Sequence, residues 1–575
     1  MGLDRRAVLG LALASAGLAT TAEAGEASSQ MLAAVDVSGD GAHRYAQAII
    51  DIQRYGAQHR AANALPGLTM ALVDRDGFTG FLRFGYANVD RRDPLRPDHL
   101  FQIGSISKSF AALCIWRLVE AGKIGLDDDV QTLLPEVPLP RGTRITLQSL
   151  LNHSSGLPDD APAFPRGGDQ RLWRGFETGT HWSYSNLGYQ LLGDIAARLH
   201  GRPYAQVVQS EILDPLGMKE TAPAILTRDR PRYATGYSPF WEDRAYPQGA
   251  RLTHGPWTSM LKAAGCIAST ARDMAIYARY LIQAGAGHGA PLLSDAGATR
   301  FCAPTIDAPD WPGPGSRYAN GLAVVQVGGR SLLHHTGGML IFNSSIHVDP
   351  IAGVAAFAST NAGDIPYRPR GLTAFACERM RAARDQTPAP KPRPVQPTMD
   401  AADDRRGSYA TKSGRRMEIH PTLSGVLVAY VDGRSIPLEV AGEDILIAKD
   451  PAATPDGFVF SRRERRVERV WWGETEFVRD DAHFNVAFTA PTSPAVSALT
   501  GRYESDDPWR GGFTILAQGE RLYVDGAMPL TPLRDGSYRV GDNDWSPERI
   551  QFDAIEAGRP QRAVLSGVDY TRREA

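Results

Sequence analysis

The stretch FQIGSISKSFAAL, residues 101–113, places three serines around one lysine, Lys108, in an otherwise apolar or small-residue segment. The apolar residues recur with the period of an α-helix, so the stretch is predicted to begin a helix. Residues three apart on a helix share a face, and Ser105 stands three positions before the lysine. Ser107 and Ser109 adjoin the lysine in sequence and point about 100° away from it.

Ser105 has the surroundings that a nucleophile needs. It lies at or just inside the predicted helix N-terminus, where free N–H groups and the helix dipole favour an anion. A buried Lys108 would have its pKa lowered by desolvation and could accept the serine proton near neutral pH. S-x-x-K alone is a weak motif, because it often arises by chance. A capping serine beside a solvated lysine is the alternative.

Two downstream stretches support the catalytic interpretation. HWSYSNLGYQLLGDIA contains Tyr184, which could relay a proton beside such a lysine, and Asn186, which could hold both the lysine and a substrate carbonyl. LLHHTGGML places the sequence His-Thr-Gly-Gly on a predicted strand, where glycines let a substrate lie against the strand edge. The N–H of Gly338 could then join that of Ser105 as an oxyanion hole.

These motifs in this order resemble the serine β-lactamase/penicillin-binding hydrolases, nearest the class C β-lactamase branch. The resemblance covers about residues 45–384 and includes TLQSLLNHSSGLP and GCIASTARDMAIYARYL. It implies an α/β domain over residues 40–384, with an antiparallel sheet flanked by helices and an all-helical subdomain. Apolar strands at both ends of this region, with helices between them, indicate the same arrangement.

The resemblance also assigns roles to residues. Ser105 would be the acylated nucleophile, Lys108 its proton partner and Tyr184 the general acid/base, with no metal or cofactor. His153, although conspicuous, is structural in this family. The residues implied to position the substrate or its oxyanion are Asn186, His335, Thr336, Gly337 and the N–H groups of Ser105 and Gly338.

One residue departs from the pattern of many relatives. His335 stands where those relatives carry the lysine of Lys-Thr-Gly, which helps to hold a substrate carboxylate. Histidine is mostly neutral at pH 7. We therefore rank β-lactams and D-Ala-D-Ala carboxylates behind other substrates, although a charged His335 would still serve.

The N-terminus is predicted to direct export. Residues 1–24 comprise a charged start with Arg5 and Arg6, an apolar run and the cleavage pattern Ala-Glu-Ala. The paired arginines resemble a twin-arginine signal, with an ordinary secretory signal as the alternative. The apolar run is shorter than the roughly 20 residues needed to span a bilayer. We therefore expect a periplasmic or secreted protein without stable membrane insertion.

The C-terminal region contains a duplicated pattern. A proline-rich linker, residues 385–406, is followed by two related segments, 407–490 and 499–575. Both segments open with Gly-x-Tyr (Tyr409 and Tyr503), contain YVDG and then Pro-Leu, and end in a strand followed by arginine. Short β-runs with turn signals predict two small antiparallel β-barrel-like domains.

This architecture is similar to that of three-domain D-aminopeptidases, in which a loop of the last barrel reaches the active site. Two acidic loops of the second segment, YESDDPW and VGDNDW, are candidates to bind a substrate ammonium. Solvated turn acids are the alternative for each of their carboxylates. The residues concerned are Asp506, Asp507, Asp542 and Asp544.

Composition excludes other classes of function. The net charge of −2 provides no general attraction for nucleic acid or an anionic membrane. The four cysteines are widely spaced and form no zinc pattern. They are expected to be small buried hydrophobes, with a Cys266–Cys302 bridge left open.

The sequence therefore predicts an exported serine hydrolase that forms an acyl-enzyme on small amides, peptides or esters. D-amino-acid-containing substrates are favoured, as in a D-aminopeptidase. The alternatives are a carboxylesterase or a β-lactamase/D,D-carboxypeptidase and, among non-enzymes, a penicillin-binding-like peptide-binding module. A small-molecule or peptide substrate is the expected partner, and a homo-oligomer is left open.

Overall fold

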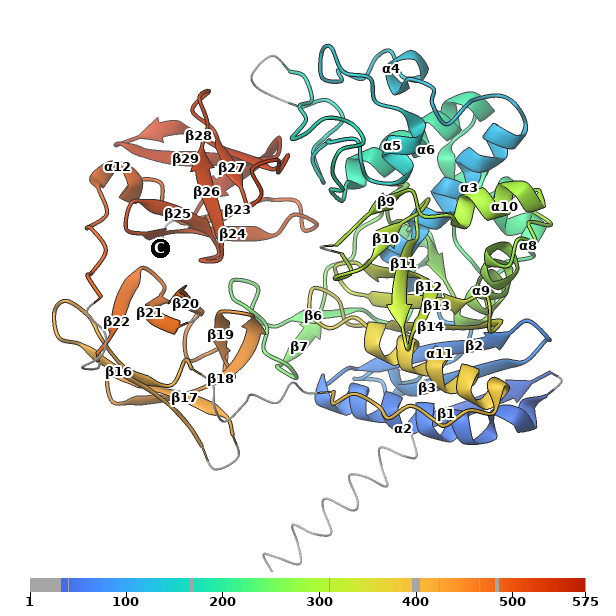
Figure 1. The fold of residues 1–575 in the computed structure, drawn as a ribbon, viewed down its shortest axis with the longest axis horizontal. Helices are drawn as coiled ribbons and strands as arrows, with labels where there is room; N and C mark the ends of the chain where they lie inside the picture. Colours follow the sequence, from blue (N-terminus) through green and yellow to red (C-terminus); the bar gives the residue numbers. More distant parts are fainter. Residues whose placement is uncertain are drawn as a thin grey trace, which may run out of the picture.

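The computed structural model describes residues 33–39, 41–165, 170–309, 311–395, 404–422, 425–464, 466–480 and 486–573. The predicted export signal, residues 1–24, lies outside the described residues, as does part of the predicted linker. Figure 1 shows the N-terminal domain on one side and the two C-terminal barrels beside one another on the other.

Ten strands of the described chain form one antiparallel sheet, in the order β1-β3-β2-β14-β13-β12-β11-β10-β9 with β4 paired to β3. The pairing of β2 with β14 joins the two ends of the domain, as predicted. The strands are β1 (Ala33–Ser38), β2 (Gly67–Asp74), β3 (Thr79–Asn88), β4 (Asp93–Pro94), β9 (Ile306–Asp307), β10 (Arg317–Tyr318), β11 (Ala323–Val327), β12 (Arg330–Gly338), β13 (Asn343–Asp349) and β14 (Val354–Thr360).

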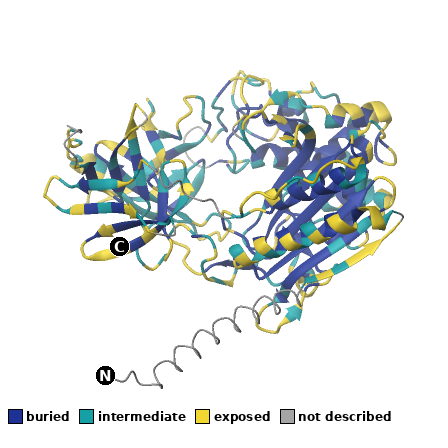
Figure 2. Cartoon of the chain, turned by 60° about the horizontal axis from the view of Figure 1, so that its bottom comes forward, coloured by how far each residue is buried: buried dark blue, intermediate teal, exposed yellow. Residues whose placement is uncertain are grey.

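Both faces of the sheet are covered, and strand β2 shows why. Alternate side chains of a strand point to opposite faces. Ala71 and Val73 face the cluster formed with the helical subdomain, whereas Met70 and Leu72 face α2 (Ala46–Ala62) and α11 (Arg370–Asp385). Figure 2 shows buried strands between helices whose outer faces are exposed.

The helical subdomain covers the face opposite α2 and α11, and its core is continuous with the sheet. Among the described residues, no helix combines the length and apolarity needed to cross a bilayer. The helices here are α3 (Ser107–Glu120), α4 (Val130–Leu133), α5 (Leu147–Leu151), α6 (Asn186–His200), α7 (Tyr204–Val208), α8 (Asp214–Leu216), α9 (Ala271–Gly285) and α10 (Asp295–Cys302). Short strand pairs β5 (Phe101–Gln102) with β8 (Ala268–Ser269) and β6 (Tyr237–Pro239) with β7 (Leu252–His254) complete the domain.

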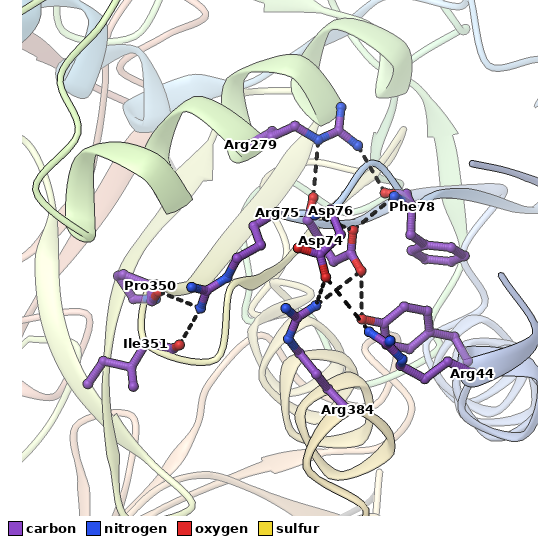
Figure 3. Close-up of polar contacts among 10 residues, drawn as sticks. Arg44, Asp74, Arg75, Asp76, Phe78, Arg279, Pro350, Ile351 and Arg384 are labelled. Atoms are coloured by element: carbon purple, nitrogen blue, oxygen red, sulfur yellow. Dashed lines mark hydrogen bonds and ion pairs between the residues drawn. The ribbon is translucent and has the colours of Figure 1, made fainter. Parts of the chain in front are cut away.

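A buried carboxylate joins distant parts of this domain. Asp74, at the end of β2, accepts hydrogen bonds from Tyr45 Oη and from Phe78 N, both at 2.8 Å. Arg384 of α11 lies 3.3 Å from Asp74 and 2.7 Å from Asp76 (Figure 3). The β2–β3 turn is therefore tied to the N-terminal and C-terminal helices.

The C-terminal region forms two closed antiparallel barrels, which confirms the predicted fold class. Each barrel has its own buried apolar core. The first contains β15 (Gly407–Ala410), β16 (Arg416–Pro421), β17 (Leu427–Val431), β18 (Arg434–Gly442), β19 (Ile445–Ala448), β20 (Phe458–Arg463), β21 (Arg466–Trp472) and β22 (Thr475–Arg479). After α12 (Pro494–Ser497), the second contains β23 (Gly501–Glu504), β24 (Gly512–Gln518), β25 (Arg521–Val524), β26 (Met528–Pro532), β27 (Tyr538–Val540), β28 (Arg549–Glu556), β29 (Arg559–Leu565) and β30 (Val568–Arg572).

The duplicated sequence pattern corresponds to the closure of each barrel. Tyr409 on the first strand pairs in register with Arg479 on the last strand, and Tyr503 pairs with Arg572 in the same way. Each arginine lies over the ring of its tyrosine, at 5.2 and 5.7 Å from the ring centroid. The repeated Gly-x-Tyr and terminal arginine are therefore the residues where each barrel closes.

Loss of the Asp74 carboxylate is expected to destabilise the N-terminal domain. Asp74→Ala removes an acceptor that is 1% exposed and serves Tyr45, Phe78 and Arg384. We expect the free energy of unfolding to fall by about 3 kcal/mol, because breaking a buried ion pair leaves its partners unpaired. Denaturant unfolding followed by tryptophan fluorescence measures this change.

The neighbouring Asp76 is the matched control, because its side chain is 50% exposed and bonds to the same Arg384. Asp76→Ala should cost less than about 1 kcal/mol. Equal losses in the two variants would contradict the central role of Asp74.

Candidate active site

The Ser105 turn and strand β12 approach each other closely, and glycines make this approach feasible. Ser105 lies in the 3₁₀ turn Gly104–Ile106, directly before α3. Gly104 has φ 54°, and a Cβ there would lie 2.7 Å from the nitrogen of Gly338. A Cβ on Gly337 would lie 1.9 Å from the carbonyl oxygen of Ile103. The turn therefore seats Ser105 beside the end of β12.

The Lys108 amine is fully buried and surrounded by hydrogen-bond partners. Its Nζ lies 3.1 Å from Ser105 Oγ, 2.5 Å from Asn186 Oδ1 and 2.9 Å from the carbonyl oxygen of Ala264. The Ser105 hydroxyl is partly exposed. A reactant could thus reach the serine without reaching the lysine.

These partners determine where a neutral lysine points its lone pair. The Asn186 and Ala264 oxygens can only accept hydrogen bonds, and a neutral amine has two N–H groups for them. The lone pair is then left for the Ser105 hydroxyl. Burial lowers the pKa of Lys108 to about 7, against the opposing effect of the Asp159 and Asp160 charges. The neutral form is thus accessible near neutral pH.

The two neighbouring serines have structural partners instead. Ser107 Oγ accepts a hydrogen bond from the Ile267 N–H at 3.1 Å. Ser109 Oγ donates to the Ile106 carbonyl at 2.8 Å and accepts from Tyr277 Oη at 2.6 Å. Both serines are fully buried, which agrees with the prediction that they are bystanders.

Tyr184 lies against the lysine. Lys108 Nζ is 4.6 Å from the centroid of the Tyr184 ring. Burial raises the pKa of Tyr184 well above its ordinary value, and a hydrogen bond with Ser105 partly opposes this shift. Tyr184 is therefore a neutral phenol at neutral pH. The motifs Ser-x-x-Lys, Tyr-x-Asn and His-Thr-Gly thus lie together in the structure.

The His153 ring packs against the ring of Tyr184. Its ring lies 4.5 Å from that of Tyr184, and its Nδ1 accepts a hydrogen bond from the Ser185 N–H at 3.0 Å. Burial lowers the pKa of His153 well below its ordinary value, so the ring is neutral. These contacts fit the structural role expected for it.

His335 is also neutral. Its Nδ1 lies 2.6 Å from the Thr336 carbonyl, which can only accept, so Nδ1 carries the proton. Its Nε2 then accepts from Tyr318 Oη at 3.0 Å. Burial lowers the pKa of His335 well below its ordinary value. His335 therefore does not supply the positive charge of the lysine found in many relatives.

A different cation lies at this end of the strand. A Cβ on Gly338 would lie 2.4 Å from Arg368 Nη2, which places the guanidinium directly beside the end of β12. Arg368 is exposed and has no ion pair among the described residues. Sequence reasoning missed it, because a single arginine before α11 has no motif around it.

Sequence reasoning also missed a chain of hydrogen bonds that leads to Lys108 from the second barrel. Glu548 Oε1 accepts from the Asp159 N–H at 2.8 Å, and Asp159 Oδ1 accepts from the Asn186 N–H at 2.9 Å. Asn186 Oδ1 in turn accepts from Lys108. Burial raises the pKa of Asp159, and the nearby Asp160 and Glu548 charges add to this shift.

The second barrel holds this chain in place through two loops. Trp173 Nε1 donates to the Pro547 carbonyl at 2.6 Å, and the rings of His181 and Trp545 stack at 4.9 Å. Arg510 forms an ion pair with Asp160 at 3.1 Å. The barrel therefore docks on the segment that carries Asp159 and leads to Tyr184.

The four aspartates that the sequence offered as ligands for a substrate ammonium do not make these contacts between the domains. The Asp506 side chain is 99% exposed, and Asp507 accepts from the Trp509 N–H within its own loop. Neither Asp542 nor Asp544 forms a side-chain hydrogen bond or ion pair within the described part of the chain. The loops are those that the sequence indicated, but the carboxylate that reaches the catalytic domain is Glu548.

Comparison with known proteins identifies the family. The model of the beta-lactamase family matches residues 52–374. The chain belongs to the beta-lactamase family. This finding confirms the resemblance drawn from the motifs and makes the chain a β-lactamase-fold hydrolase.

Individual relatives agree with this assignment. Penicillin-binding protein 4* of Bacillus subtilis is 37% identical over 154 residues, 24% of this chain and 34% of that protein. The D-aminopeptidase of Gluconobacter oxydans is 30% identical over 272 residues, 44% of this chain and 48% of that protein. The matches thus span half or less of the length of these relatives.

A solved structure supports the fold alone. The octameric penicillin-binding protein homologue from Pyrococcus abyssi has a TM-score of 0.54 and 24% identity. The similarity covers 75% of this chain and all of that one.

The lowered pKa of Lys108 predicts the pH dependence of Ser105 reactivity. A protonated amine cannot accept the serine proton, so the rate of labelling by a fluorophosphonate should rise as pH increases through about 7. Lys108→Met should lower the rate by about 10²-fold or more at every pH. The fraction of labelled protein, measured by mass spectrometry at successive times, gives the labelling rate at each pH for the wild type and for Lys108→Met.

Ser107→Ala is the matched control and should retain the wild-type labelling rate at Ser105. A labelling rate that is independent of pH between 5 and 9 (about two units either side of the Lys108 pKa) would contradict the assignment of Lys108 as base.

Proposed function

We propose that the protein is an exported serine hydrolase that forms an acyl-enzyme on D-amino-acid-containing amides, peptides or esters. The observation that carries the reaction class is the hydrogen bond between the buried Lys108 amine and Ser105 Oγ, with Asn186 and Ala264 occupying the other lysine contacts. Family membership supports the same class.

The reaction begins with transfer of the Ser105 proton to neutral Lys108 while the serine oxygen attacks the substrate carbonyl. The N–H groups of Ser105 and Gly338 bind the oxyanion of the tetrahedral intermediate. Tyr184, in contact with both Ser105 and Lys108, relays the proton to the leaving group. The acyl-enzyme is then attacked by water, and the same groups return the proton to Ser105.

The carboxylate of Asp159 favours substrates with a free amino group. One of its oxygens is bonded to the Asn186 N–H, and Asp159 is partly exposed beside the catalytic lysine. An ammonium placed there would offset the repulsion among the Asp159, Asp160 and Glu548 carboxylates. The similarity to a D-aminopeptidase supports this choice.

Arg368 favours a second candidate function. Its unpaired guanidinium beside Gly338 could bind a carboxylate on the substrate, as a D,D-carboxypeptidase or β-lactamase requires. This charge could replace the one that neutral His335 does not provide. A peptide with a free N-terminus and a nearby C-terminus would use both Asp159 and Arg368.

Ser105→Ala should abolish turnover. We expect kcat for a nitrophenyl ester to fall by about 10³-fold or more, because the variant has no nucleophile. The same assay with D- and L-aminoacyl nitroanilides and with nitrocefin ranks the substrates. Absence of hydrolysis across the whole panel would support the non-catalytic penicillin-binding-like module instead.

The Asp159→Asn variant tests whether Asp159 binds the ammonium group of a substrate without taking part in the chemical step. KM for D-alanyl nitroanilide should rise about tenfold or more, because a hydrogen bond to a charged group contributes about 1.5–3 kcal/mol. KM for nitrophenyl acetate, which has no amine, should stay within about twofold. Arg368→Gln is the matched variant and should instead weaken turnover of substrates with a carboxylate. Equal effects of Asp159→Asn on both substrates would argue against an ammonium site.

A further inference from the structure

A second pocket lies at the end of α2, with a volume of about 650 Å³. Its walls come from the segment after α2, the end of β3 and the β6–β7 hairpin, and none of the proposed catalytic residues lines it. Such a volume is within the range of roughly 300–1,000 Å³ that small-molecule sites occupy. Its apolar lining includes Leu65, Val89 and Leu252, with Tyr86 and Tyr237 beside them.

Arg60 lines this pocket without a partner for its charge. Its Nε is buried and has no hydrogen bond, and no ion pair to Arg60 exists among the described residues. Burial lowers the pKa of Arg60, which reflects this desolvation. A guanidinium removed from water normally gains a carboxylate or phosphate in exchange.

The backbone around Arg60 does not meet this need. Arg60 lies in the last turn of α2, where carbonyl groups attract a cation. The carbonyls of His59, Arg60 and Ala61 already accept backbone N–H groups from the residues that follow the helix. The helix end therefore favours the positive charge but leaves the buried Nε–H of Arg60 without an acceptor.

The position of Arg60 is specifically accommodated by the fold. Gly85 of β3 has φ 74°, and a Cβ there would lie 2.4 Å from Arg60 Nε. The atom nearest to such a Cβ is the Pro66 carbonyl oxygen, at 2.3 Å, so the glycine leaves room for this carbonyl and for the Arg60 guanidinium together. If no cation were required beside Gly85, an apolar side chain at position 60 could fill the same space.

A second arginine lies on the hairpin wall of the same pocket. Arg251 contacts the Phe240 ring at 4.3 Å and has no ion pair within the described ranges. The carboxylate in the lining, Asp90, is 71% exposed and bonds to His254 at 2.9 Å. The lining thus includes the half-buried Arg60, the exposed Arg251 and one carboxylate that already has a partner.

We propose that this pocket binds a small organic oxyanion, a carboxylate or a phosphate on an apolar or aromatic body. Arg60 at the floor binds the anion through its planar N–H groups, Arg251 adds a second contact from the hairpin, and the apolar walls hold the body. The site is separate from the hydrolytic centre and does not depend on the function proposed for it.

Calorimetric titration of the full chain with benzoate and with phenyl phosphate tests the proposal, with benzyl alcohol as the uncharged analogue. Saturable binding of at least one anion is expected. The anion that binds more tightly shows whether the pocket prefers a carboxylate or a phosphate. Benzyl alcohol should not bind. Arg60→Met should weaken the binding by about tenfold or more, since a charge-assisted contact is lost.

Arg54→Met is the matched control, because Arg54 lies on the same helix with a side chain that is 70% exposed. It should bind as the wild type does. Arg368→Met should retain the binding that Arg60→Met weakens, which distinguishes this pocket from any binding of a carboxylate at the hydrolytic centre. Arg251→Met, with Arg60 retained, should weaken binding to a smaller extent.

Thermal unfolding without ligand gives an independent readout. Arg60→Met removes a half-buried arginine whose Nε has no hydrogen-bond partner, so its unfolding midpoint should equal or exceed that of the wild type. Failure of both anions to bind would overturn the proposal. Binding that Arg60→Met leaves unchanged would overturn it as well.

Discussion

Lys108 is cut off from water, so the protein itself must provide every hydrogen bond to its amine. The three partners come from the Ser105 turn, the first residue of α6 and the segment before β8. These segments meet only if the helical subdomain, the sheet and the short β5–β8 pair are all assembled. The same burial that demands this assembly lowers the pKa of Lys108 and so makes its neutral form accessible near neutral pH. Both the assembly of these segments and the lowered pKa therefore follow from the burial of the Lys108 amine.

Features fixed by local geometry could be predicted from the sequence. The three-residue spacing of Ser105 and Lys108 defines a shared helix face, and the structure brings them within hydrogen-bond distance. The repeated Gly-x-Tyr and arginine predicted a duplicated β-domain, because barrel closure reuses one residue pair in each copy. The pairing of β2 with β14 followed from apolar strands at both ends of the domain.

Features created by tertiary packing could not be predicted. The Ala264 acceptor is a backbone carbonyl, which any residue would supply, so no residue type marks it. Asp159 and Glu548 are ordinary acids in sequence, and it is the docking of the second barrel that buries them together. The acidic loops were conspicuous by charge, yet an exposed side chain such as Asp506 remains in solvent. Arg60 belongs to an amphipathic helix, and its burial depends on the space left by Gly85 on another strand.

The bond between Glu548 and Asp159 joins residues 389 positions apart in the chain. During synthesis, the serine, lysine and tyrosine all emerge long before the barrel that supports their neighbour. A nascent chain can thus fold its hydrolase domain while the support for Asn186 and Lys108 is still absent. The second barrel therefore completes a set of contacts that the N-terminal domain cannot form by itself, because Glu548 lies outside that domain.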